Sequence, residues 1–195
     1  MVKFILASNS SRRKQILSTL GIKFVCVPHK YKEPRIKKHC FPKKFVEKVA
    51  VSKAKSLKKE YNDCVIISAD TIVVLNNEII GKPKDYKEAE EILRKLSDTK
   101  HKVYTGMCIY YPKKNIILSG VEESTVYTYK LEEKKIKELA KKHLDKAGAY
   151  AVQQKDDKFV KKIVGDYYNV VGFPVKLFLK LYTELIYKIS ETKNL

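Results

Sequence analysis

Apolar residues near the start of the chain follow two different periods. Short apolar runs at residues 2–7 and 23–27 predict strands. Residues 10–20, between them, show helical spacing. The apolar stripe of this helix consists of Ile16, Leu17 and Leu20. Gly21 is a suitable stop, so a strand, a helix and a second strand are expected in that order.

The next segment predicts a helix and a hairpin. A helix is expected over residues 43–60. Its inward side is predicted to hold Phe45, Val49, Ser52 with Lys53, and Ser56. Residues 64–75 are rich in β-branched side chains and predict a buried strand, interrupted at Ala69–Asp70–Thr71. Asn76–Asn77 then favours a tight turn into residues 78–81.

The remaining pattern completes an α/β domain. Residues 85–96 predict an amphipathic helix, for which Asp85 is a suitable N-cap. The inward residues of that helix are Ala89, Ile92, Leu93 and Leu96. Two alternating strands and two helices follow, at about residues 101–111, 115–128, 132–143 and 174–189. Because βαβ units and antiparallel hairpins are mixed, we expect a mixed, partly antiparallel sheet flanked by helices. Nothing resembling a linker divides the sequence, which predicts one domain over residues 1–195.

The formal net charge of +19 suggests anionic partners. Nearly all of the positive charge is lysine, spread along the whole sequence. The arginines are Arg12, Arg13, Arg35 and Arg94. Because readers of nucleic acid favour arginine forks, the charge alone does not indicate a nucleic-acid protein. Small phosphorylated substrates would be attracted as well, and no stable nucleic-acid complex is expected.

Cysteine spacing and hydropathy exclude other classes. The cysteines are Cys26, Cys40, Cys64 and Cys108, without C-x-x-C spacing, which favours reduced thiols over a disulfide scaffold. His39 is adjacent to Cys40, but no second ligand pair stands at a zinc spacing. No apolar run is long enough for a membrane span or a signal-peptide core. We therefore expect a cytoplasmic protein without a membrane partner.

Asp70 and Lys82 are candidate functional residues. Asp70 lies within the apolar "IISADTIVV", where an unpartnered carboxylate is costly. We expect it at the end of a strand beside a metal, a cation or a cleft; a structural aspartate that caps a turn is the alternative. Lys82, between Gly81 and Pro83, is held in a rigid corner that can aim its ammonium, although a solvated surface lysine also fits.

Other polar residues give weaker signals on their own. Lys53 is on the apolar side of its helix, where it could simply pack its stem. Glu33 lies in an irregular stretch, and Gln153 could read a base edge or end a helix. Arg12 and Arg13 begin a helix, where the backbone dipole disfavours cations unless an anion binds there.

Together these segments resemble the Maf family of nucleotide pyrophosphatases. "LASNSSRRKQILSTLGI" is similar to the family opening L-A-S-x-S-P-R-R-x-x-L-L. "VAVSKAKS", "ISADTIVVLNNEIIGKPKDYKEAEEILRKLS", "HKVYTG", "DKAGAYAVQ" and "GDYYNVVGFP" continue the likeness, from Phe4 to about Leu185. The resemblance implies an elongated, two-lobed, Maf/Ham1-like fold around a cleft. It also implies hydrolysis of nucleoside triphosphates to the monophosphate and pyrophosphate with Mg²⁺ or Mn²⁺. Related proteins are often dimers, which makes a homodimer a candidate assembly.

The resemblance also assigns roles to individual residues. The implied phosphate-binding residues are Ser8, Arg12, Arg13, Lys53 and Lys82. Glu33 and Asp70 are the implied metal ligands, and Asp70 is also the implied proton acceptor that activates water. The positions linked to base selection are Arg12, Thr71 and Gln153, whose chemistry suits thymine or uracil.

Selectivity is the point on which the sequence leaves alternatives. "DTIVV", "HKVYTG" and "DKAGAYAVQ" resemble a family branch that acts on dTTP and UTP more than the branch that acts on 7-methyl-GTP. Ser11 replaces a usual proline with a hydroxyl able to cap the helix, and Asp98 and Gln154 replace usual glycines. A 7-methyl-GTP pyrophosphatase is the first alternative. The second is a non-catalytic protein that binds nucleic acid or a division partner.

Overall fold

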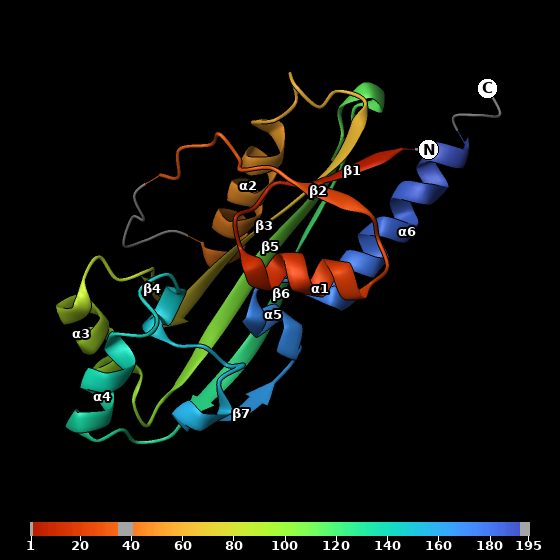
Figure 1. The fold of residues 1–195 in the computed structure, drawn as a ribbon. Coiled ribbons are helices and arrows are strands. Elements are labelled where there is room, and N and C mark those ends of the chain that lie inside the picture. Colours follow the sequence, from red (N-terminus) through yellow and green to blue (C-terminus); the bar gives the residue numbers. More distant parts are fainter. Residues whose placement is uncertain (1, 35–40, 192–195) are drawn as a thin grey trace.

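A seven-stranded mixed sheet organises the protein, described here from a computed structural model over residues 2–34 and 41–191 (Figure 1). The strand order is β2-β1-β3-β5-β6-β7, and β4 pairs with β3. The strands are β1 (Lys3–Leu6), β2 (Phe24–Cys26), β3 (Cys64–Leu75), β4 (Glu78–Ile80), β5 (Lys100–Tyr111), β6 (Ile116–Thr128) and β7 (Val160–Val164). β1 is parallel to β2 and β3, whereas all the other pairings are antiparallel. The predicted mixed α/β architecture is confirmed.

Helices cover both faces of the sheet at one end and gather beside it at the other (Figure 1). They are α1 (Ser11–Thr19), α2 (Pro42–Lys55), α3 (Tyr86–Leu96), α4 (Glu133–Ala140), α5 (Tyr167–Val171) and α6 (Val175–Glu191). Successive β3 residues point to opposite faces. Val65 and Ile67 therefore join a core with α1 and α6, and Ile66 joins a separate core with α2. A third core lies under α3 and α4.

Most of the predicted elements are present. Asn76 and Asn77 both have positive φ, as a tight hairpin turn requires. The four predicted inward residues of α3 are all buried, and Asp85 caps that helix through the amide of Glu88. The buried side of α2 differs from the prediction: it consists of Val46, Val49, Ala50, Lys53 and Ala54. β7 and α5 were not predicted.

The position of Asp70 differs from the sequence prediction. β3 runs without interruption through Ala69–Asp70–Thr71, so Asp70 lies in the middle of a strand rather than at its end. β1 pairs with β3 only as far as Ile67, and β4 pairs with it only from Val73. The edge of β3 between these points is left open beside its two shorter neighbours. A carboxylate in the middle of a strand thus reaches a cleft.

Gly106 allows α2 to approach this part of the sheet. Gly106 pairs with Asp70 across β5 and β3. A Cβ at Gly106 would overlap the backbone carbon and oxygen of Val46 in α2. The absence of a side chain therefore lets the α2 backbone lie directly on β5, and this contact places Lys53 above Asp70.

Two further expectations from the sequence concern a membrane span and a zinc site. No helix within residues 2–34 and 41–191 is both long and apolar enough to span a bilayer. His39 and Cys40, considered for a zinc site, lie outside the described residues, as does Arg35.

Candidate active site

A cleft of about 870 Å³ opens at the uncovered edge of β3. All the residues predicted for the site line it: Ser8, Arg12, Arg13, Glu33, Lys53, Asp70, Thr71, Lys82 and Gln153. They come from α1, α2, β3 and the segments that follow β1, β2 and β4, together with residues 147–153. The fold thus brings distant parts of the chain to one cavity.

Lys53 lies between the two predicted acidic ligands. Its Nζ is 2.6 Å from Glu33 Oε1 and 2.7 Å from Asp70 Oδ1. The Lys53 side chain is 5 % exposed and that of Asp70 is 12 % exposed, whereas that of Glu33 is 51 % exposed. Lys53 is therefore more than a surface lysine with a packed stem: it is a buried cation shared by two carboxylates.

The environment of Glu33 favours its ionised form. Burial raises the pKa of Glu33, but the hydrogen bond and charge of Lys53, with smaller contributions from Lys82 and His29, together bring the pKa below its ordinary value. His29 Nε2 is 3.8 Å from Glu33 Oε1. Burial and the charge of Lys53 lower the pKa of His29, which favours the neutral imidazole at pH 7. Sequence reasoning missed His29, although it stands four residues before Glu33.

Arg13 connects three elements around the cleft. Its Nε donates to the Gly172 carbonyl at 2.8 Å, Nη2 to Thr71 Oγ1 at 3.1 Å and Nη1 to Ser8 Oγ at 3.4 Å. These partners are all neutral, and within the described residues Arg13 forms no ion pair. Burial lowers the pKa of the Arg13 guanidinium, and the charge of the nearby Asp70 offsets only part of this change. The guanidinium is fixed in position while its charge remains available to an anion.

The start of α1 faces the same cavity. Ser10, rather than the predicted Ser11, is the N-cap, and its hydroxyl accepts from the amide of Arg13. Ser8 Oγ accepts from the amide of Ser10 at 3.2 Å. Arg12 also lines the cleft; burial lowers the pKa of its guanidinium and the charge of Asp145 opposes that change. Asp145 lines the cleft too and was not predicted.

Lys82 and Gln153 are exposed residues that line the cleft. Lys82 directly follows Gly81, whose carbonyl accepts from the Gly148 amide at 3.2 Å. This hydrogen bond joins the segment after β4 to the segment that ends in Gln153. Thr71 Oγ1 accepts from Arg13 and lies 3.0 Å from Thr105 Oγ1. The Thr71 hydroxyl is thus already engaged in holding Arg13.

Tyr150 anchors the segment that carries Gln153. The Tyr150 hydroxyl is 2.7 Å from His101 Nε2, and both residues are buried. The Tyr150 ring also contacts Phe159 edge-on, with centroids 5.2 Å apart. Sequence reasoning missed this pair, because residues 49 positions apart meet only in the folded chain. Both stand within motifs quoted above, "HKVYTG" and "DKAGAYAVQ".

Burial of His101 makes folding stability depend on pH. Burial lowers the pKa of His101 from 6.5 to about 4. As the pH falls below 6.5, the unfolded chain therefore binds a proton that the folded chain does not. We expect this residue to reduce the free energy of unfolding by about 2 kcal/mol between about pH 7.5 and about pH 5. In His101→Gln, which still offers Tyr150 an acceptor, urea denaturation at both pH values should show a fall smaller by that amount. Parallel pH profiles for the two proteins would contradict the assignment.

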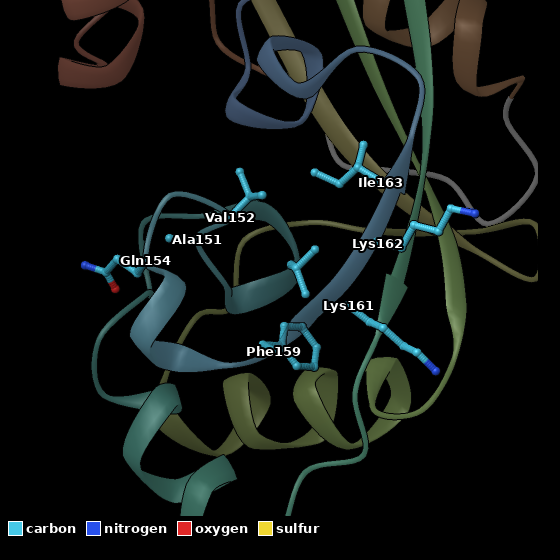
Figure 2. A pocket seen from close by; sticks show the side chains of 8 residues that line it. Ala151, Val152, Gln154, Phe159, Lys161, Lys162 and Ile163 are labelled. Carbon is cyan, nitrogen blue, oxygen red and sulfur yellow. The ribbon is translucent and has the colours of Figure 1, made fainter.

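A smaller hollow of about 330 Å³ lies beside the cleft, between residues 151–154 and β7 (Figure 2). Lys161 and Lys162 point away from it, and its described lining contains no carboxylate. Gln154, at a family glycine position, borders both cavities. Asp98, at the other such position, adopts the left-handed conformation with φ of 55° and lies outside the lining of the cleft.

The two carboxylates fit a hard divalent cation. Glu33 Oε1 and Asp70 Oδ1 both contact one positively charged atom, so they converge on a single point. Within the described part of the chain, no group of three or more His, Cys, Asp or Glu residues could hold a metal. Mg²⁺ commonly uses one or two carboxylates together with water and substrate phosphates. The chemistry of this donor pair matches that requirement.

Comparisons with known proteins show the family of this chain. The family model described as "Maf-like protein" matches residues 3–185. A dTTP/UTP pyrophosphatase of Acholeplasma laidlawii is 40% identical over 178 residues, covering 90% of this chain and 93% of that protein. Another, from Aquifex aeolicus, is 41% identical over 194 residues, covering 94% and 96%. A dITP/XTP pyrophosphatase structure from Mycobacterium abscessus aligns with a TM-score of 0.48 at 15% identity, over 80% of this chain and 92% of that one. With its motifs gathered in one cleft and a family match over nearly its whole length, this chain belongs to the Maf family.

Proposed function

We propose that this protein is a nucleoside triphosphate pyrophosphatase that hydrolyses dTTP, UTP or modified pyrimidine nucleotides to the monophosphate and pyrophosphate. The observation that carries the proposal is the carboxylate–lysine–carboxylate cluster, which lines one cleft together with Arg12, Arg13 and Lys82. The names of the relatives at 40% and 41% identity support the same reaction. Residues 1–195 would act as one domain, since β3, β5 and β6 run through both ends of the fold (Figure 1).

The reaction requires water to attack the α-phosphorus. The bond from that phosphorus to the bridging oxygen breaks, and its electron pair leaves with pyrophosphate. Asp70, which contacts Lys53 in the ligand-free protein, accepts the proton of the attacking water. Because phosphoryl transfer depends mainly on positioning and charge stabilisation, Arg13 and Lys82 would bind the phosphate tail from different sides.

Glu33 and Asp70 would hold the divalent cation, Mg²⁺ or Mn²⁺. When bound, such an ion neutralises phosphate charge and promotes the ionisation of water. Arg12 and Gln153 would contact the base, and Thr71 would act on selectivity through Arg13, to which it is hydrogen-bonded. A Gln153 amide can both donate to a pyrimidine carbonyl and accept from N3–H of thymine or uracil.

Pyrophosphate release from a nucleotide panel tests the proposal. Purified protein with Mg²⁺ or Mn²⁺ should release pyrophosphate fastest from dTTP or UTP, and more slowly from CTP, ATP, GTP and 7-methyl-GTP. Fastest turnover of 7-methyl-GTP would favour the alternative branch. Absence of pyrophosphate release from the whole panel, combined with DNA binding that persists at about 200 mM salt, would favour the non-catalytic alternative.

A further inference from the structure

The ammonium of Lys53 lies where the proposed metal ion has to bind. The two oxygens that it contacts, Glu33 Oε1 and Asp70 Oδ1, are the convergent atoms of the two candidate ligands. The Lys53 side chain is 5 % exposed, so water offers it little alternative solvation. In the ligand-free protein the carboxylate pair is therefore already occupied by an internal cation.

A divalent ion and this ammonium cannot both contact the same two oxygens closely, because two positive centres would then face each other across a short distance. Binding of the metal through these two convergent oxygens thus requires Lys53 to leave at least one carboxylate. A buried ammonium that loses a carboxylate needs another anionic partner. The phosphate tail of a nucleotide in the same cleft would provide that partner.

We propose that Lys53 competes with the metal for the two carboxylates, and that nucleotide binding moves Lys53 from the carboxylates to the phosphates. This inference rests on the proposed function. Lys53 then couples the two ligands: each makes binding of the other tighter, by the same factor. The ligand-free protein has low metal affinity, and the metal site is completed only when a substrate is present.

The opposite role for Lys53 is also physically reasonable, and it predicts the opposite sign. If Lys53 mainly holds the two carboxylates in place for the metal, its removal should weaken metal binding. If Lys53 competes, its removal should tighten metal binding in the absence of nucleotide. The direction of one affinity change therefore distinguishes the two roles.

Electron paramagnetic resonance of free Mn²⁺ measures this affinity without turnover. The full-length protein is titrated with Mn²⁺ alone, and again with the non-hydrolysable analogue α,β-imido-dUTP. Without the analogue, Lys53→Met should bind Mn²⁺ about tenfold more tightly than the wild type, within the usual range of coupling between sites. The analogue should tighten Mn²⁺ binding to the wild type and have much less effect on the variant.

Lys82→Met is the matched control, because it removes the same charge from an exposed lysine of the same cleft that contacts neither carboxylate in the structure. Its Mn²⁺ affinity should change by less than about threefold, as expected for a screened, exposed charge. Lys53→Gln, which keeps a hydrogen-bond donor, is the second variant if Lys53→Met does not fold. The inference would be overturned if, without nucleotide, the Lys53 variant bound Mn²⁺ as tightly as the wild type or more weakly.

The test is separable from the proposed function. Pyrophosphate release by the wild type is measured independently of Mn²⁺ binding to the ligand-free protein. If release is absent but the Lys53 variant binds Mn²⁺ more tightly, the proposed function fails and cation competition stands. If release occurs but the variant binds Mn²⁺ no more tightly, cation competition alone fails.

Discussion

Asp70→Asn should lower kcat/KM for pyrophosphate release from dTTP or UTP by about 10³-fold. Asparagine has almost the same shape but cannot take a proton from water, and it is a weaker metal ligand than a carboxylate. Lys53 keeps its other partner, Glu33, so the ammonium is not left alone in the variant. The fold should persist, and circular dichroism with thermal unfolding checks that it does.

Asp85→Asn is the control for this change. Asp85 is an exposed N-cap of α3, and asparagine caps helices about as well as aspartate. The control should retain the activity of the wild type within about twofold, since it removes one carboxylate that does not line the cleft. An Asp70→Asn protein as active as the Asp85→Asn protein would remove Asp70 from the reaction.

Gly106→Ala should cause the largest loss of stability among the changes considered. The new methyl group would overlap the backbone of Val46, which cannot rotate away as a side chain can. Either α2 moves off β5 or the strand bends. We expect a loss of about 3 kcal/mol, at the upper end of typical overpacking costs, and a fall in Tm of about 6–12 °C for a chain of this size. Activity should fall as well, because α2 carries Lys53.

Gly120→Ala provides the matched comparison in the neighbouring strand. The three atoms nearest to a Cβ at Gly120 all belong to the flexible side chain of Leu177, and the nearest is Cδ1 at 2.9 Å. We expect the free energy of unfolding to fall by less than about 1 kcal/mol, because Leu177 can change rotamer. Equal losses in the two variants, measured by urea denaturation, would show that the contact between α2 and β5 is not specially tight.

The sequence predicted most of the fold because most elements have strong local signals. The Asn76–Asn77 turn and the amphipathic spacing of α3 depend on residues that are close in sequence. β7 contains Lys161 and Lys162 side by side, which hides any alternation of apolar and polar residues. α5 spans only Tyr167–Val171, too short to show a helical period.

The misplacement of Asp70 has a physical explanation. In a sheet with strands of equal length, a functional carboxylate reaches a cleft at the end of its strand. Here the neighbours of β3 on one edge are short, so the cleft lies beside the middle of the strand. The length of β1 relative to β3 depends on strand pairing, which the local pattern around Asp70 does not specify.

The membership of the site could be predicted, but the contacts within it could not. All nine residues that the resemblance named line the cleft in the structure. The sharing of Lys53 between two acids, and the hydrogen bond from Arg13 to Gly172 across 159 positions, depend on the folded arrangement. Arg13, near the start of α1, binds neutral oxygens, and under the proposed function its charge would act on the phosphates.

A crystal structure with Mg²⁺ and α,β-imido-dUTP tests the central claim most directly. It should show the triphosphate chain between Arg13 and Lys82, Mg²⁺ between Glu33 and Asp70, and the uracil ring next to Gln153. A nucleotide bound in the smaller hollow beside β7, or anywhere else away from Asp70, would contradict the account.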